Sequence, residues 1–221
     1  MDYQGIAELS CNLCFDVYRE ESNFPQYNRV KVENGRSIAF IYETEEYNVL
    51  SFRGTDDWGD WIANLTVFTF RVKEVKYTGY NPFKVNMNAK VHLGFMKSFF
   101  RLYRELDKKV KEVSNGKKWI VCGHSLGGAM ASLAVLKLPI PQPALVTFGA
   151  PVWGNDDANW TVCQMSSMNL NFINGSDIVT WIYRPLRPKA CPPILLTSEN
   201  AGHWFKSHRE YRQALGLESS W

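Results

Sequence analysis

The chain has 221 residues, of which 45% are hydrophobic and 14% aromatic, so it is long and apolar enough for a sizeable core and is not disordered. Twenty-five basic residues against 22 acidic ones leave a net charge of only +3, and no run of Lys or Arg forms a nucleic-acid footprint. The sequence contains no internal repeat or linker. We therefore expect a single domain over residues 1–221 that does not bind nucleic acid.

Membrane and export signals are missing from the sequence. No apolar stretch reaches the length of a membrane span, and the first ten residues have neither the basic start nor the apolar core of a signal peptide. We expect a cytoplasmic protein, or a secreted one if a signal peptide has been removed. An odd number of cysteines, five, is not typical of a disulfide framework, and Cys11 and Cys14 lack a second spaced pair for zinc. We interpret the cysteines as mostly buried thiols.

The N-terminal quarter predicts a helix and then a hairpin. Apolar residues at helical spacing indicate an amphipathic helix over residues 3–19, packed on one side of the domain. Residues 37–42 and 47–52 are predicted strands, joined by the acidic turn ETEE. The second strand ends in SFRGT, and a backbone N–H at this Gly-Thr corner is placed to turn toward a substrate.

Residues 56–66 predict a short amphipathic helix, with four apolar side chains on one stripe: Trp58, Trp61, Ile62 and Leu65. The stripe by itself is compatible with core packing. Residues 68–73 alternate as in a half-buried strand, and residues 77–88 read as a long loop. Order resumes at residue 90, and a long amphipathic helix follows from Phe95 to Val113, before an Asn-Gly stop.

Residues 118–132, KWIVCGHSLGGAMAS, predict a buried strand, a tight turn and a helix rich in small residues. Ser125 is at the apex of this turn, where the backbone is strained, and Gly123 and Gly127 leave room for it. This arrangement is a nucleophile elbow, which directs the hydroxyl toward the positive N-terminus of the helix. The alternative is that Ser125 merely caps the helix. The strand before it and the helix after it favour the elbow.

Two further predicted strands follow, at residues 144–148 and 169–173. Because strands and helices alternate, we expect an α/β fold with a largely parallel sheet. Asp177 comes just after the second of these strands, where such sheets place ligand-handling groups. Residues 194–197 and 204–217 are a predicted last strand and closing helix.

A serine nucleophile needs a base and an acid that orients the base. In this strand order the acid and then the histidine come after the serine along the chain, so only His203 and His208 remain as candidate bases. The residues alone do not decide between these two histidines. Asp177 is the preferred acid, with turn capping as its alternative role. Asp156 and Asp157 lie in a polar run and are expected to be solvated.

Seven motifs in this order resemble those of the class 3 (fungal-type) lipases: SFRGT, DWGDWIANL, AKVHLGF, CGHSLGGA, TFGAP followed by GN, GSDIV and SHREY. The resemblance runs from about residue 36 to the C-terminus. It implies an α/β-hydrolase fold with a mostly parallel central sheet flanked by helices, and a short amphipathic lid at residues 56–66. It also implies roles for five residues: Ser125 as nucleophile, Asp177 as acid, His208 as base, and Thr55 and Leu126 as donors of oxyanion-hole N–H groups, Thr55 adding its hydroxyl.

The resulting prediction is a serine carboxylic-ester hydrolase that needs no metal or cofactor and forms an acyl-enzyme. By resemblance its substrates are acylglycerols or related lipid esters, with transient contact at a lipid interface, while phospholipase A1-type or short-chain esterase activity stays open. A rival of another class is a catalytically inactive module that binds lipid surfaces. The chain departs from the family pattern at Val152-Trp153, where an arginine is usual, and in a short stretch between Asp177 and His208.

Overall fold

A seven-stranded sheet forms the centre of the computed structural model, which describes residues 1–54, 72–74, 89–113, 115–175, 177–181, 191–196 and 210–217. The strands lie in the order β1-β2-β3-β6-β7-β8-β9. Strands β3, β6, β7, β8 and β9 run parallel to one another, while β2 pairs antiparallel with both β1 and β3. The prediction of a mostly parallel sheet is confirmed. Their bounds are β1 Asn28–Asn34, β2 Ser37–Glu43, β3 Tyr47–Phe52, β6 Lys118–His124, β7 Ala144–Phe148, β8 Met168–Asn174 and β9 Ile194–Leu196.

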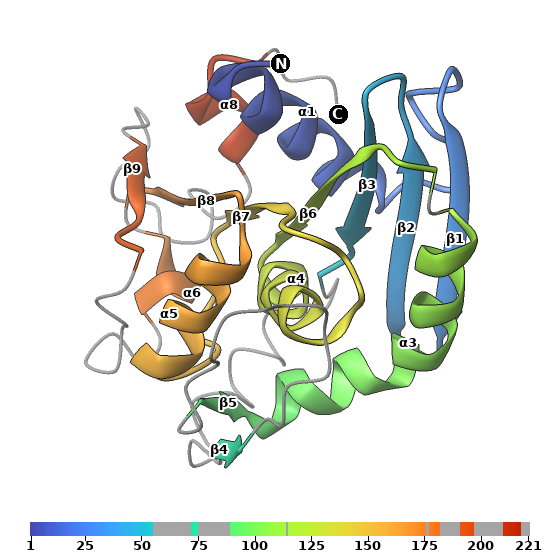
Figure 1. Ribbon diagram of the computed structural model, residues 1–221. Helices are drawn as coiled ribbons and strands as arrows, with labels where there is room; N and C mark the ends of the chain where they lie inside the picture. The colour runs from blue at the N-terminus through green and yellow to red at the C-terminus, as the bar shows by residue number, and fades with distance from the viewer. Residues whose placement is uncertain are drawn as a thin grey trace.

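Helices cover both faces of this sheet (Figure 1). On one face lie α1 (Tyr3–Asp16) and α8 (Tyr211–Ala214), which pack against each other. On the other face lie α3 (Leu93–Glu112), α4 (Leu126–Lys137) and α5 (Asp156–Met165). A short helix, α6 (Ile178–Trp181), follows β8, and the strands β4 (Val72–Glu74) and β5 (Lys90–His92) form a separate antiparallel pair.

Two hydrophobic cores, one on each face, follow from the alternation of side chains along the central strands. In β6, Trp119 and Val121 join the core beneath α3, α4 and α5, while Ile120 and Cys122 join the core beneath α1. Almost every residue of α4 is buried, because its glycines and alanines let it lie close to the sheet. The helix that follows Ser125 is therefore held firmly by its surroundings.

The predicted strands at residues 37–42, 47–52, 144–148 and 169–173 are confirmed, and so is the long helix after residue 93. The N-terminal helix ends at Asp16, three residues earlier than predicted. Among the described elements, the edge strand β1 and the helices α5 and α6 were missed. Of the predicted closing helix the structure describes only the turns of α8, and the predicted helix at 56–66 and loop at 77–88 lie outside the described residues.

The cysteines follow the prediction in part. Cys11, Cys14 and Cys122 are buried free thiols, and burial raises the pKa of Cys14 well above its ordinary value, so this thiol stays neutral. Cys163 of α5 and Cys191 before β9, by contrast, form a disulfide, which corrects the expectation of thiols at these two positions. Among the described helices, none is long and apolar enough to cross a membrane.

Candidate active site

Ser125 occupies a strained turn between β6 and α4. Its φ of 59° and ψ of −128° lie in a region that residues with a side chain rarely adopt. The turn is possible only because its glycine neighbours carry no Cβ. A Cβ on Gly123 would lie 2.2 Å from the carbonyl carbon and oxygen of Gly127, and a Cβ on Gly127 would lie 2.2 Å from the carbonyl oxygen of Phe52. The sequence pattern and the backbone geometry therefore agree at this turn.

The turn at Ser125 is held by backbone hydrogen bonds and not by the serine side chain. The side chain makes no capping hydrogen bond to α4, which answers the alternative that Ser125 is only a helix cap. Instead the backbone holds the turn: the Ser125 N–H donates to the Phe148 carbonyl at 2.8 Å, and the Ser125 carbonyl accepts from the Gly128 N–H at 2.8 Å. Within the described residues, Oγ is buried and has no hydrogen-bond partner. A nucleophile awaiting a base and a substrate has these properties.

Leu126, the first residue of α4, follows the serine directly. The N–H groups of a helix's first turn have no acceptor within the helix, and the helix dipole makes this end positive. Both the N–H groups and the helix dipole would stabilise an oxygen that becomes negative near Ser125. The second predicted oxyanion donor, Thr55, lies outside the described residues, but its neighbour Gly54 is described and lies beside Ser125.

Asp177 lies in the loop after β8, at the carboxyl end of the sheet, and is completely buried. One carboxylate oxygen accepts from the Val179 N–H at 2.9 Å, and the other accepts from the Tyr211 hydroxyl at 2.6 Å. The same Tyr211 oxygen accepts from the Asn174 N–H at 3.0 Å. Tyr211 thus connects the loop of Asp177 to the end of β8, a contact that the sequence did not indicate.

Ser125 and Asp177 are brought to the same region by shared neighbours. The Tyr211 ring lies edge-on to the rings of His124 and Phe148, with centroids 5.8 and 5.9 Å apart. Phe148 in turn holds the Ser125 N–H through its carbonyl. Asp156 and Asp157, in contrast, lie in the first turn of α5, exposed and half-buried, as expected for solvated carboxylates.

The segment that departs from the family pattern packs against β5. Val152 and Trp153 are both buried, and the Trp153 carbonyl accepts from the His92 N–H at 2.8 Å. The Asn155 side chain caps α5 by accepting from the Ala158 N–H and also accepts from the Lys90 N–H at 2.9 Å. Apolar packing and these hydrogen bonds hold a segment in which the family pattern has an arginine.

Several predicted site residues lie outside the described residues. They are His203, His208, Thr55 and the four apolar residues of the 56–66 segment: Trp58, Trp61, Ile62 and Leu65. Within the part of the chain that the structure describes, no group of three or more His, Cys, Asp or Glu side chains is arranged to hold a metal ion.

Comparison with known proteins gives one family. The family model for lipase (class 3) matches residues 49–185, which is more than half of the chain. Among curated relatives, the lipase of Rhizopus niveus is 36% identical over 116 residues, covering 48% of this chain and 27% of the relative. An extracellular phospholipase A1 of Serratia liquefaciens is 29% identical over 98 residues, covering 44% of this chain and 23% of the relative. The chain thus spans less than half the length of these relatives.

The fold is also that of solved lipases. The Rhizomucor miehei lipase in its propeptide complex superposes with a TM-score of 0.62 at 24% identity, covering 81% of this chain and 61% of that chain. This likeness covers a larger share of the chain than the segment that the family model matches.

Proposed function

Since the chain belongs to the class 3 lipase family, we propose that it is a serine carboxylic-ester hydrolase that acts on lipid esters through an acyl-enzyme. The observation that carries the proposal is the strained, buried Ser125 at the head of α4, whose hydroxyl does not cap the helix. Backbone strain of this kind costs about 1–3 kcal/mol and persists where the surroundings enforce it, commonly at active sites.

The proposed reaction has two halves. In the first, the Ser125 oxygen attacks the ester carbonyl carbon while its proton passes to a histidine base, and the N–H groups of Leu126 and Thr55 stabilise the oxyanion. The intermediate collapses, the C–O bond to the alcohol breaks, and the imidazolium returns the proton to the leaving alcohol. In the second half, water attacks the acyl-enzyme by the same route and releases the carboxylic acid. Asp177 orients the imidazole and stabilises its charged form.

His208 is the proposed base, and the position of Tyr211 supports it. Tyr211 donates to Asp177, and His208 precedes it by three residues, a length of chain that reaches about 10 Å at most. His203 is eight residues from Tyr211 and is not restricted in this way. The contact between Tyr211 and Asp177 therefore supports His208, rather than His203, as the proposed base.

Acylglycerols or related lipid esters are the proposed substrates. The relatives include a lipase, a phospholipase A1 and a secreted mono- and diacylglycerol lipase of Fusarium solani, so the family acts on more than one lipid head group. A phospholipase A1-type activity is the second candidate, which the Serratia liquefaciens match favours. A series of p-nitrophenyl esters from C2 to C16, together with a phospholipid, would rank these substrates and the short-chain esterase alternative.

We also propose that residues 56–66 form a lid. Ser125 is completely buried, so a substrate reaches Oγ only after a covering segment moves. The segment follows the proposed oxyanion residue Thr55 directly, and its stripe of Trp58, Trp61, Ile62 and Leu65 suits both a closed apolar site and, when open, a lipid surface.

A single domain over residues 1–221 remains our proposal for the chain's organisation. For its compartment, the sequence prediction was the cytoplasm, with secretion as the alternative. The disulfide between Cys163 and Cys191 favours the alternative, because disulfides persist in oxidising compartments and are rare in the cytosol. Fractionation of the source cells, with assay of the medium, would decide between the two.

Labelling with a fluorophosphonate tests the proposed function directly. The wild-type protein should be modified at Ser125 and should hydrolyse a p-nitrophenyl ester, while Ser125→Ala should lose both properties and keep its fold. Loss of the nucleophile in a triad costs on the order of a million-fold in kcat. A folded wild-type protein that is neither labelled nor active would instead be the lipid-surface binding module, and would contradict the proposal.

A further inference from the structure

Tyr18 lies at the corner next to the nucleophile, although it belongs to the N-terminal segment. Its hydroxyl oxygen accepts a hydrogen bond from the Gly54 N–H at 3.0 Å. The two residues are 36 positions apart, and Tyr18 precedes the segment that matches the family model. The contact therefore joins the N-terminal segment to the backbone just before Thr55.

The space around Gly54 shows how close this hydroxyl is to the reaction centre. A Cβ on Gly54 would lie 2.5 Å from the Tyr18 hydroxyl oxygen, 2.9 Å from the His124 carbonyl oxygen and 3.4 Å from the Cβ of Ser125. One methyl-sized position thus touches both the phenol oxygen and the side chain of the candidate nucleophile. Gly54 is glycine because the Tyr18 hydroxyl and the elbow occupy the place of a side chain.

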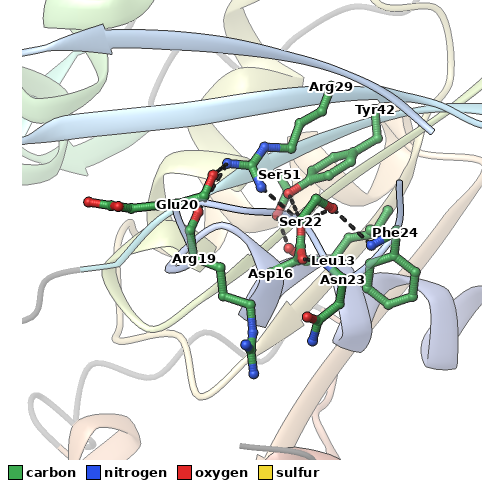
Figure 2. Close-up of polar contacts among 10 residues, drawn as sticks. All are labelled: Leu13, Asp16, Arg19, Glu20, Ser22, Asn23, Phe24, Arg29, Tyr42 and Ser51. Carbon is green, nitrogen blue, oxygen red and sulfur yellow. Dashed lines mark hydrogen bonds and ion pairs between the residues drawn. The ribbon is translucent and has the colours of Figure 1, made fainter. Parts of the chain in front are cut away.

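The turn that carries Tyr18 is fixed by a polar network around the buried Asp16 (Figure 2). Asp16, at the end of α1, is 2% exposed, and its carboxylate accepts from the Ser22 hydroxyl, the Asn23 N–H and the Tyr42 hydroxyl, each at 2.8 Å. Burial and the Asp16 carboxylate raise the pKa of Tyr42, so its phenol keeps the proton that it donates. These bonds join the beginning of the turn to its end.

Arg29 of β1 completes the same network. One of its terminal nitrogens lies 3.3 Å from the Asp16 carboxylate, and the other donates to the carbonyls of Arg19 and Glu20 at 3.0 and 3.1 Å. Its guanidinium also lies over the Phe40 ring, 4.1 Å from the centroid. The residues on both sides of Tyr18 are therefore anchored to the sheet, and the phenol has little freedom to leave Gly54.

From these contacts we propose that Tyr18 is a positioning residue of the Ser125 site, which holds the Gly54 backbone beside the nucleophile, immediately before Thr55 and its proposed oxyanion N–H. The inference rests on the proposed function, in which that N–H stabilises the oxyanion. Glycine allows more backbone conformations than any other residue, so the chain alone does not determine where the peptide after Gly54 points. An oxyanion donor contributes most when it is held in place before the charge develops, and the Tyr18 hydroxyl restrains the residue that directly precedes the proposed donor.

The test is Tyr18→Phe, which keeps the ring and removes the oxygen, with Tyr103→Phe as its control. Tyr103 of α3 is a half-buried tyrosine that packs on Phe99, in the core beneath α3 to α5. For Tyr18→Phe we expect kcat on a soluble ester to fall by about ten- to a hundred-fold with KM within about two-fold, because the affected bond strengthens in the transition state. Tyr103→Phe should keep wild-type kcat.

Titration with a fluorophosphonate counts the folded, reactive sites, and kcat per titrated site separates slower chemistry from loss of folded protein. A Tyr18→Phe protein with wild-type kcat per site, or with a change in KM alone, would overturn the inference. So would an equal loss of kcat in Tyr103→Phe. If the wild-type protein is not labelled and hydrolyses no ester, it is the proposed function that fails, and the two failures are thereby distinguished.

Discussion

Replacing Tyr211 with phenylalanine should lower both the stability of the protein and its turnover. The substitution removes one oxygen, which donates to the Asp177 carboxylate at 2.6 Å and accepts from the Asn174 N–H at 3.0 Å in a fully buried place. A hydrogen bond to a charged group contributes about 1.5–3 kcal/mol, and a buried N–H left without a partner costs about 1–3 kcal/mol. Allowing for partial relaxation, we expect the free energy of unfolding to fall by about 2–4 kcal/mol.

Turnover should fall because Asp177 loses one of the groups that hold its carboxylate. The Val179 N–H still holds the other oxygen, so the acid keeps part of its orientation. We expect kcat to fall by roughly ten- to a hundred-fold, well short of the ~10,000-fold that loss of the acid's charge costs in a well-studied triad. The assay is hydrolysis of a soluble p-nitrophenyl ester, run well below the melting temperature, which should itself drop by roughly 5–15 °C.

Tyr42→Phe is a matched control for this substitution. Tyr42 is also fully buried, and its hydroxyl also donates to a buried carboxylate, that of Asp16, at 2.8 Å. It should lose about 1.5–3 kcal/mol of stability, because its hydroxyl makes one hydrogen bond where that of Tyr211 makes two, while kcat changes by less than about two-fold, since Asp16 keeps its other donors. If both variants lose kcat equally, the loss reflects general destabilisation. If Tyr211→Phe keeps wild-type stability and kcat, the reasoning from its hydrogen bonds is wrong.

Three further predictions concern other parts of the site and fold. His208→Ala should reduce kcat as severely as loss of the nucleophile, whereas His203→Ala should reduce kcat far less. Ester assays measure this, with circular dichroism as the folding check. Loss of kcat in His203→Ala alone would reverse the assignment. Burial lowers the pKa of His92, whose ring accepts a hydrogen bond from the Gly94 N–H. Below about pH 6.5 this histidine is therefore protonated more readily in the unfolded state than in the folded state, and the free energy of unfolding should fall as the pH falls further. Urea unfolding at pH 5 and 7 measures this, and His92→Asn, which can cap without titrating, should show a smaller difference; an equal difference would exclude His92 as its source. If residues 56–66 are a lid, activity should rise once an ester passes its solubility limit. Trp61→Ser should weaken that rise more than it weakens hydrolysis of a soluble acetate ester. A plot of rate against substrate concentration that follows a simple hyperbola through the solubility limit would indicate a fixed, open site.

The sequence predicted those parts of the fold whose cause is local. Strands such as β6 and β7 are continuous apolar runs ended by glycine, and the elbow depends on glycines that flank one serine, so both are visible in short windows. The helix α5 was missed although Asn155 followed by Asp156 and Asp157 is a helix-start signal. That segment was interpreted only as a polar run with solvated carboxylates. In β1 only Val32 is buried, so this edge strand has little apolar alternation to detect.

Contacts between distant residues were beyond the reach of the sequence. The hydrogen bond between Tyr18 and Gly54 spans 36 positions, and the one between Tyr211 and Asp177 spans 34. Tyr18 belongs to no motif, and the SHREY motif that contains Tyr211 does not indicate its partner; only the packing of α1 and α8 on the sheet brings the phenols to the elbow and the acid loop. The pairing of Cys163 with Cys191 was missed for the same reason, because five cysteines give no unique connectivity.

The packing of α1 against α8 has a consequence for recombination between homologous lipases. Neither helix belongs to the span of residues 49–185, yet Arg212 of α8 donates to the Asn12 side chain of α1, and the two helices lie together on one face of the sheet (Figure 1). A chimaera that takes α1 from one parent and α8 from another would separate side chains of the two helices that fit one another, such as Asn12 and Arg212. Chimaeras that take α1 and α8 from the same parent should therefore be active more often than chimaeras that take the two helices from different parents.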